Sequence, residues 1–503
     1  MEETLGDEWR VALVAQICVY GNVPISRSAQ GCAPTGPACG RMTRRSPKRV
    51  RPLRGTRRVR LTASLVTVAV VTTLVLAGCT NSRGVTTAAQ SDCNAKAFTS
   101  ANINWKQQKV ATVTVAVEEH PWWQTIQPQI SCFEKLTGIT VKPTVLGEDQ
   151  FVSKLPTQLS SGSATPDVFM VNQYGQAQGS GWLQPLDSYL SNPKLTDKSW
   201  YNVNDFFGGA KDFAKTDGKY MALPITAEAQ MLFVRDDLVK SVPTTIEGLE
   251  QAAAAANKGG VAGFGSRSVA NANETPWPFG GFAFSDGGTF LNKTSAPELD
   301  SAANVKALER YSKLISQYGP KGGSGWGFLQ NEQAMQQGNM AIWTDSSTFL
   351  GALKDKTKSK YGSNINAYPF PTGASGRSLP NAWYWTVGIN SKSKQKNAAW
   401  LFLQWATSEP ISEEGAAKGA SPARQAAWDS KSASATIGAD NAERVKKAIA
   451  SVDSSYLSNA WKNTSWSQVA DPLARAINSS VTGADPSSSL ADAQKSAASI
   501  LGK

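Results

Sequence analysis

Short apolar runs alternate with amphipathic stretches along the chain from Trp105 onward. The runs are rich in valine and of strand length, whereas the stretches between them repeat their apolar positions at helical spacing. The first predicted strands span 110–117, 140–147 and 167–172, and the predicted helices between them span 121–138 and 151–162. This β-α-β-α-β order predicts an α/β fold with a largely parallel sheet, in which ligands bind beyond the carboxyl ends of the strands.

The same alternation continues to the end of the chain, which closes on three amphipathic segments. Further strands are predicted at 231–235, 260–265 and 340–344, and further helices at 302–319, 396–408, 442–454, 465–481 and 489–503. Residues 265–290 interrupt the pattern with glycine, asparagine and aromatic residues, which predicts a long surface or functional loop. The part of the chain that shows this alternation is longer than one hydrophobic core usually supports, so we expect it to fold as two domains.

An uncharged apolar run at residues 61–79 follows an arginine-rich stretch and ends in Leu76-Ala77-Gly78-Cys79. Basic, apolar and small residues in that order are typical of a secretory signal. The ending resembles the lipobox of bacterial lipoproteins, which implies that Cys79 is lipidated and becomes the first mature residue. The expected protein is then exported and lipid-anchored to the outer face of the cell membrane. A plain transmembrane anchor is the alternative, because the run could span about 27 Å.

The segments that flank this run have separate interpretations. Residues 42–78 form the expected lipoprotein signal peptide, exported by the general or the twin-arginine route, and residues 1–41 are a mis-annotated or disordered extension. Residues 79–104 are small and polar and predict a lipid-anchored flexible tether.

Removal of the signal changes the charge and the cysteine count. Twelve of the 51 Lys and Arg and four of the 39 Asp and Glu precede Cys79, so the remainder carries a net charge of only +4. This near-balance gives no support for nucleic-acid binding. With Cys79 acylated, Cys93 and Cys132 remain as either a disulfide in an oxidising compartment or two unpaired thiols.

Four segments in register carry a resemblance to a known family. They span residues 165–190, 217–253, 331–347 and 368–410, and include the stretches GWLQPLD, DGKYMALP and NMAIWT. Together they resemble the family 1 extracellular solute-binding proteins of ATP-driven sugar importers, the group that includes maltose-binding protein. Ile246 and residues 233–235 depart from the usual family pattern, and the stretches ALPITAE and NAWYWTVGI look most like the sorbitol/mannitol-type members.

The resemblance implies a two-lobed periplasmic-binding-protein fold of type II. Each lobe is expected to hold a mixed, mostly parallel sheet flanked by helices, with the ligand in the cleft between the lobes. Residues 105–227 and 372–430 would form lobe 1, and residues 228–371 and 431–503 would form lobe 2. Such a protein would be a monomer that closes on a sugar or sugar alcohol and delivers it to the permease subunits of an ABC importer in the membrane.

Candidate ligand-binding residues come from the mixture of aromatic and polar side chains near predicted strand ends. Sugar rings present C–H faces that stack on indole and hydroxyls that need acids and amides in fixed positions. The resemblance adds Glu228, Gln230, Arg424 and Trp466. The full candidate set is Glu118, Glu119, His120, Trp122, Trp123, Asn172, Tyr174, Glu228, Gln230, Trp277, Trp326, Trp343, Asp345, Trp383, Trp385, Arg424 and Trp466. For the tryptophans, packing in the core is the competing interpretation.

Other functions remain as alternatives. A glycosidase needs two carboxylates across the scissile bond, and Glu118 or Glu119 with Glu228 could supply them, although no motif marks such a pair. His120 is the only histidine, so neither a poly-histidine metal site nor a catalytic triad is indicated, and no cofactor or metal is expected. A peptide, an iron complex or an anion could replace the sugar, and a surface adhesin is the remaining class.

Overall fold

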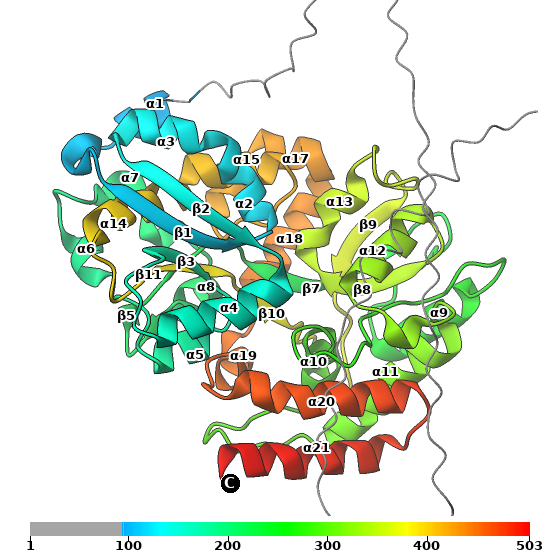
Figure 1. The fold of residues 1–503 in the computed structure, drawn as a ribbon. Coiled ribbons are helices and arrows are strands. Elements are labelled where there is room, and N and C mark those ends of the chain that lie inside the picture. The colour runs from blue at the N-terminus through cyan, green and yellow to red at the C-terminus, as the bar shows by residue number, and fades with distance from the viewer. Residues whose placement is uncertain (1–92, 94) are drawn as a thin grey trace, which may run out of the picture. The chain divides into compact units, whose positions relative to one another are not determined.

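Two β-sheets organise the described part of the chain, which is Cys93 and residues 95–503 of a computed structural model (Figure 1). The first sheet has the order β2 (Thr140–Leu146), β1 (Thr112–Glu118), β3 (Val168–Val171), β11 (Thr386–Ile389) and β6 (Leu223–Pro224). Strands β1, β2 and β3 run parallel, and β11 runs antiparallel to both β3 and β6. The parallel β-α-β-α-β unit predicted from the sequence is therefore confirmed.

The second sheet is built around β7 (Glu228–Arg235). Its other strands are β8 (Ile342–Ser346), β9 (Ile365–Pro369) and β10 (Ala382–Trp383), and all three pair with β7 in antiparallel orientation. Parallel bridges from Ala262 and Gly265 extend the sheet beyond β8. This sheet is mixed, as expected, but all its strand pairs around β7 are antiparallel, so it is not mostly parallel.

The chain passes between the two sheets where short segments run side by side. The first passage lies between β6 and β7, and the second lies at Tyr384 and Trp385, between β10 and β11. Residues 421–424 run beside the first passage, because the Ala227 N–H donates to the Ser421 carbonyl. Strand β10 pairs with β7, so residues 382–383 still belong to the second sheet. This pairing corrects the expected lobe boundary at 371/372.

Helices flank the first sheet and cover the segments around it. They are α1 (Ala95–Thr99), η2 (Trp105–Gln108), α2 (Pro121–Ile126), η3 (Gln127–Gln129), α3 (Ile130–Thr137), α4 (Glu148–Ser160), α5 (Tyr174–Gly179), α6 (Asp187–Ser191), α7 (Lys198–Tyr201), η4 (Val203–Asp205), α8 (Gly208–Phe213) and α14 (Lys396–Ala406). A small ribbon of β4 (Lys215–Thr216) and β5 (Lys219–Tyr220) adjoins them. The predicted helix at 121–138 is split, because Pro128 lacks the N–H that a continuous helix needs.

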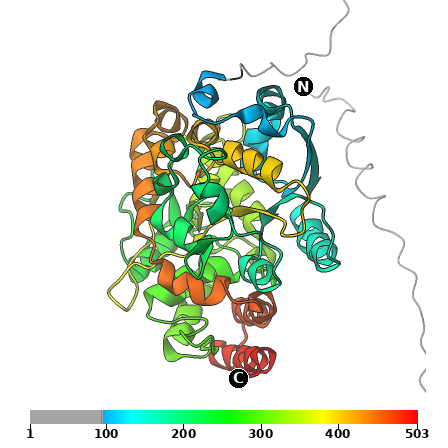
Figure 2. The same cartoon turned by 90° about the vertical axis from the view of Figure 1, so that its left-hand side faces the viewer.

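A second group of helices follows the second sheet and ends the chain. They are α9 (Ile246–Ala256), α10 (Pro276–Ser285), α11 (Ala302–Tyr318), η5 (Gly323–Gly325), α12 (Phe328–Gln337), η6 (Ser347–Phe349), α13 (Leu350–Lys354), α15 (Glu409–Ala417), α16 (Gln425–Asp429), α17 (Lys431–Ile437), α18 (Ala439–Ser451), α19 (Ser454–Trp461), α20 (Trp466–Val481) and α21 (Pro486–Leu501). Helices α20 and α21 lie next to each other in both views (Figures 1 and 2).

The long helices follow from capping and apolar spacing. Helix α11 begins after Ser301, whose side chain accepts the Asn304 N–H, and its buried residues Ala307, Leu308, Tyr311 and Ile315 share one face. The predicted loop at 265–290 is wrong in its second half, because residues 276–285 form α10. All ten residues of α10 are buried, so an amphipathic pattern is missing from its sequence.

The beginning of the described chain is attached to the first group of helices. Phe98 is buried, with its ring centroid 6.5 Å from that of Trp105 and 6.1 Å from that of Trp200. This packing corrects the predicted tether, which therefore ends before α1. Cys93 and Cys132 form a disulfide with 5.4 Å between their Cα atoms.

Several expectations lie outside the described residues. They are the extension at 1–41, the signal peptide at 42–78, the lipidation of Cys79 and the first part of the tether. Among the helices that the structure describes, none is both long and apolar enough to cross a membrane.

Candidate functional site

A cavity of about 320 Å³ is lined by residues from both sheets. It lies beyond the carboxyl ends of β1 and β3, and the first residue of β7 and the last residue of β8 reach it from the second sheet. Its volume is at the lower end of the roughly 300–1,000 Å³ range of small-molecule pockets. Nine of the predicted site residues line it: Glu118, Glu119, His120, Asn172, Glu228, Trp277, Trp383, Trp385 and Trp466.

Glu118 ends β1, and Asn172 directly follows β3. These two strands are parallel neighbours, so their carboxyl ends lie at one edge of the sheet. Glu118 is 6% exposed and lines the cavity together with Asn172. Its Oε2 atom has no hydrogen-bond partner in the described part of the chain. Burial, together with the negative charges of Glu148 and Glu228, raises the pKa of Glu118 to about 8. The Oε2 atom of Glu118 is therefore not engaged by a hydrogen bond from the part of the chain that the structure describes.

His120 lines the same cavity and is uncharged at neutral pH. Its Nδ1 accepts the Trp122 N–H at 3.1 Å, which caps the first turn of α2, and its ring centroid lies 5.1 Å from that of Trp385. Burial lowers the pKa of His120 to about 3, so the ring is neutral. It shapes the cavity and caps a helix, whereas its neighbour Glu119 is exposed.

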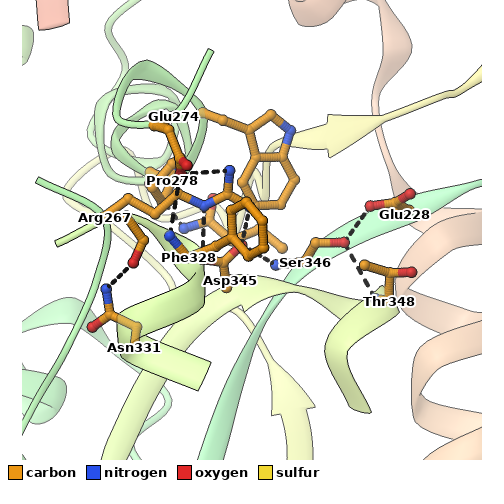
Figure 3. A network of polar contacts seen from close by, with 12 residues as sticks. Glu228, Arg267, Glu274, Pro278, Phe328, Asn331, Asp345, Ser346 and Thr348 are labelled. Atoms are coloured by element: carbon orange, nitrogen blue, oxygen red, sulfur yellow. Dashed lines mark hydrogen bonds and ion pairs between the residues drawn. The ribbon is translucent and has the colours of Figure 1, made fainter. Parts of the chain in front are cut away.

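Glu228 joins the first passage between the sheets to the end of β8. Its Oε1 accepts the Thr226 hydroxyl at 2.9 Å. Its Oε2 accepts the Ser346 hydroxyl (Figure 3). Burial raises the pKa of Glu228 to about 7, although both hydrogen bonds act in the opposite direction. Both of its oxygens are therefore engaged by the protein, in contrast to Glu118.

Arg267 reaches the cavity from the second sheet and is held by two carboxylates. Its Nε and Nη2 donate to Asp345 at 2.9 and 2.6 Å, and its Nη1 donates to Glu274 at 3.3 Å (Figure 3). The guanidinium carbon lies 5.5 Å from the Trp277 ring and 5.3 Å from the Phe328 ring. Burial lowers the pKa of Arg267, but the two carboxylates more than offset this and raise it overall.

Four tryptophans form a connected aromatic wall. Trp383 makes edge-to-face contacts with Trp385 and Trp461, at centroid distances of 5.9 and 5.5 Å, and Trp461 contacts Trp466 at 4.5 Å. Trp383 also lies directly opposite Glu228 in the pairing of β10 with β7. This places indole surface beside a carboxylate, the combination that a polyhydroxylated ligand needs.

Four predicted site residues of the first group of elements lie away from the cavity. Trp122 donates its Nε1–H to the Ala406 carbonyl, and Trp123 is buried in the core. Tyr174 bonds Thr216 through its hydroxyl. Arg424 is completely buried and donates to the carbonyls of Thr407, Asn202 and Tyr201. These side chains pack or brace the fold: the first three follow β1 and β3 in the chain, whereas Arg424 directly precedes α16.

The other four belong to the second sheet and its surroundings. Gln230 is buried and donates to the Pro278 carbonyl and the Thr344 hydroxyl. Trp343 packs between Phe233 and Phe349, with centroids 5.2 and 5.1 Å away, and Trp326 packs partly buried against the core. Asp345 does not line the cavity and instead holds Arg267. Alternation along β8 turns consecutive side chains to opposite faces, and the sequence did not tell which face meets the cavity.

Sequence reasoning missed several residues that line the cavity. They are chiefly Glu148, Arg267, Glu332, Phe349 and Trp461. Glu148 follows the second predicted strand as Glu118 follows the first, so the same argument could have found it. Trp461 lies five residues before Trp466, in the gap between the predicted helices at 442–454 and 465–481. Arg267 carried no signal of its own within the predicted loop.

Acidic side chains outnumber basic ones in the lining of the cavity. Glu118, Glu119, Glu148, Glu228 and Glu332 line it, and Arg267 is the one Lys or Arg among the described lining residues. Burial also raises the pKa of Glu332. The described residues contain no group of three His, Cys, Asp or Glu side chains that could hold a metal ion. The arrangement offers hydrogen-bond acceptors and aromatic faces to a small solute.

Comparison with known proteins places the chain. Residues 115–413 match the family described as bacterial extracellular solute-binding protein. An erythritol/L-threitol-binding protein of Mycolicibacterium smegmatis is 25% identical over 67% of this chain and 75% of its own length. A mannitol-binding protein of Pseudomonas aeruginosa is 27% identical over 60% of this chain and 70% of its own length.

A solved structure shares the architecture described above. The solute-binding protein of an ABC transporter from Agrobacterium radiobacter K84, in complex with ribitol, superposes with a TM-score of 0.69 at 23% identity, over 78% of this chain and 99% of that one. The expected two-lobed type II fold is thereby confirmed. The family match covers more than half of the chain, and the chain therefore belongs to the bacterial extracellular solute-binding proteins.

Proposed function

We propose that this protein is an extracellular receptor that captures a sugar alcohol or a small sugar and delivers it to the permease of an ABC importer. The observation that carries the proposal is the cavity, in which the buried Glu118 and the half-buried Asn172 line the same space as the aromatic wall around Trp383. Carboxylates and amides bind hydroxyls, and indole faces cover the C–H groups between them. The erythritol-, mannitol- and ribitol-binding proteins described above support the polyol class.

The volume and the charge of the cavity separate this proposal from its rivals. About 320 Å³ suits a monosaccharide or an alditol better than a long oligosaccharide or a peptide. The excess of carboxylates disfavours an anion, because like charges repel. For a glycosidase, Glu228 would need an available oxygen, whereas both of its oxygens accept hydrogen bonds from Thr226 and Ser346. We expect binding and lobe closure without a chemical step.

Export and anchoring belong to the same proposal. The ending at Leu76–Cys79 resembles a lipobox, which supports a mature chain that begins at a lipidated Cys79 on the outer face of the cell membrane. An anchored, monomeric receptor stays close to its permease. Mass spectrometry of the protein from the membrane fraction would test this, with a diacylglyceryl group on an N-terminal Cys79 as the expected result and an uncleaved apolar segment as the contradicting one.

The function is tested by thermal unfolding of the purified protein against sugars, alditols, peptides and anions. A ligand present at about 100 times its dissociation constant should raise the free energy of unfolding by about 2.7 kcal/mol. Stabilisation by an alditol or a monosaccharide is the expected result. Stabilisation by a peptide or an anion alone would keep the family and overturn the ligand class.

A further inference from the structure

The chain at residues 461–467, where α19 ends and α20 begins, forms one wall of the cavity. The lining residues of this segment are Trp461, Asn463, Thr464, Trp466 and Ser467. Helix α20 packs on α10 and α11 of the second group of elements, whereas α19 packs on α8 of the first group. The segment therefore passes from one lobe to the other along the cavity, and a ligand can extend in that direction only by moving it.

Two glycines on α5 let this segment lie directly against the first lobe. Gly175 and Gly179 are four residues apart and therefore share one face of the helix. A Cβ atom on Gly175 would lie 2.4 Å from the carbonyl oxygen of Asn463, and a Cβ atom on Gly179 would lie 2.3 Å from Cγ2 of Thr464. The first of these contacts is with backbone, so a side chain at Gly175 would push the segment away from α5.

Lys462 fastens the same segment to two further elements of the first lobe. Its ammonium group donates to the carbonyls of Asp212 on α8 and Lys215 on β4, at 2.6 and 2.8 Å. The ammonium nitrogen also lies 5.8 Å from the centroid of the Tyr174 ring. The wall is thus held on the first lobe by close packing and by hydrogen bonds, so a longer ligand would have to break both.

Trp461 is the buried aromatic residue of this wall. It is 6% exposed, and its ring centroid lies 5.5 Å from that of Trp383 and 4.5 Å from that of Trp466. Its Nε1 has no hydrogen-bond partner among the residues that the structure describes. The position of the indole therefore depends on packing against its neighbours, and a smaller side chain would widen the cavity without breaking a hydrogen bond of that ring.

Resting on the proposed function, we infer that the 461–467 segment limits the size of the ligand and that Trp461 is the residue that sets the limit. The cavity of about 320 Å³ then admits one alditol or one monosaccharide and excludes a ligand that carries a second sugar ring. Extra atoms forced into a packed space cost free energy, because the surrounding side chains and backbone must shift. The inference assigns the preference for compact ligands to named residues.

Isothermal titration with compact and elongated ligands tests the inference. The compact ligands are erythritol, ribitol, D-mannitol, D-glucitol and D-glucose; the elongated ones are maltitol and maltose, which add a glucosyl ring to the last two. We expect wild type to bind both elongated ligands at least about tenfold more weakly than its tightest compact ligand. Trp461→Ala should bind maltitol or maltose at least about tenfold more tightly than wild type does. Trp200→Ala is the matched control, because that indole packs on Phe98 and Trp105 away from the cavity.

A second variant opens the same wall from the first lobe and decides the test if urea unfolding shows that Trp461→Ala does not fold. Gly175→Ala should displace the segment through the Asn463 carbonyl and raise the affinity for maltitol or maltose several-fold. Gly208→Ala, at the start of α8, is its control, because an added Cβ atom there meets nothing within 4 Å. A wall with a merely structural role would lose affinity for every ligand in these variants and would gain none.

The outcomes separate the inference from the function on which it rests. Wild-type affinity for maltitol or maltose equal to that for the tightest compact ligand would overturn the size limit and leave the receptor function in place. A folded Trp461→Ala variant without a gain for either elongated ligand would overturn the assignment to Trp461. Failure of every alditol and sugar to bind wild type would overturn the proposed function itself.

Discussion

At the scale of single residues, Glu118 connects the charge of the cavity with the stability of the folded chain. Its pKa rises from 4.5 to about 8 on folding, whereas that of His120 falls from 6.5 to about 3. Between pH 6.5 and 8, His120 is neutral in both states, while only the folded chain keeps a proton on Glu118. The stabilising effect of that proton is complete at low pH and is lost as the pH rises through 8.

We therefore predict that the free energy of unfolding without ligand falls as the pH rises from 6.5 to 8. One carboxyl contributes at most ~1.4 kcal/mol per pH unit, and Glu228 adds to the slope only up to about pH 7. Urea unfolding at several pH values in this window measures the slope. Glu118→Gln should flatten the slope, whereas Glu414→Gln, a change at an exposed residue of α15, should not. An unchanged slope in Glu118→Gln would show that Glu118 is ionised when folded.

Trp383 and Trp343 were predicted alike from the sequence but have different surroundings in the structure. Trp383 is half-buried on the cavity, whereas Trp343 is completely buried between Phe233 and Phe349. We expect Trp383→Ala to weaken ligand binding by about 1 kcal/mol or more with little loss of stability. Trp343→Ala should instead lower the free energy of unfolding by about 3–5 kcal/mol. Titration calorimetry and urea unfolding distinguish the two, and the same affinity for Trp383→Ala as for wild type would remove the aromatic wall from the site.

The sequence indicated residue types and strand ends more reliably than it indicated which face a side chain occupies. Glu118, His120 and Asn172 were found because polar residues follow predicted strands directly. Asp345 was also found, but the structure turns it toward Arg267, which occupies the cavity in its place. Long-range pairing of this kind, 78 residues apart, leaves no periodic signal in the chain.

At the scale of elements, the segment between α18 and α20 touches both lobes. Helices α18 and α20 pack on the second group of elements, at β9 and at α10 and α11, while α19 between them packs on α8 of the first group. Lys462 donates its ammonium protons to the carbonyls of Asp212 and Lys215 at 2.6 and 2.8 Å. A Cβ atom on Gly175 would lie 2.4 Å from the Asn463 carbonyl, so the segment approaches α5 closely.

Separation of the lobes would have to break the contacts of Lys462 or move the whole segment. We therefore predict that Lys462→Met favours the open form and lowers ligand affinity several-fold, because a smaller closed population reduces the apparent affinity in proportion. Lys447→Met is the matched control, since Lys447 pairs only with Glu443 on the surface of α18. Titration calorimetry measures the affinities. Equal affinity for the two variants would show that the segment moves with the first lobe and does not affect closure.

Element prediction succeeded where helices are amphipathic and failed where they are buried on all sides. Helix α11 has a capping serine and a regular apolar face, and the sequence predicted it at the correct residues. Helix α10 contains Pro276, Pro278 and a pair of glycines, all of which favour loops, and it is helical because the surrounding core encloses it. Tertiary packing, which no local pattern encodes, decided that segment.

At the scale of the whole described chain, one hydrophobic cluster runs through both sheets. It contains Val113 of β1, Leu232 of β7, Val387 of β11 and Leu473 of α20, together with Tyr384 and Trp385 on the second passage. Glu228 adds a polar connection at the same place, through Thr226 and Ser346. The lobes thus share buried surface near the passages, in addition to the chain itself.

A shared cluster predicts that the two lobes unfold together, because exposing one lobe removes part of the apolar contacts of the other. Differential scanning calorimetry should show one transition whose calorimetric and van't Hoff enthalpies agree. A bound alditol should move that single transition upward as a unit, since the cavity takes residues from both sheets. Two transitions, of which the ligand moves only one, would mean that the lobes are stable independently and that closure joins two separate cores.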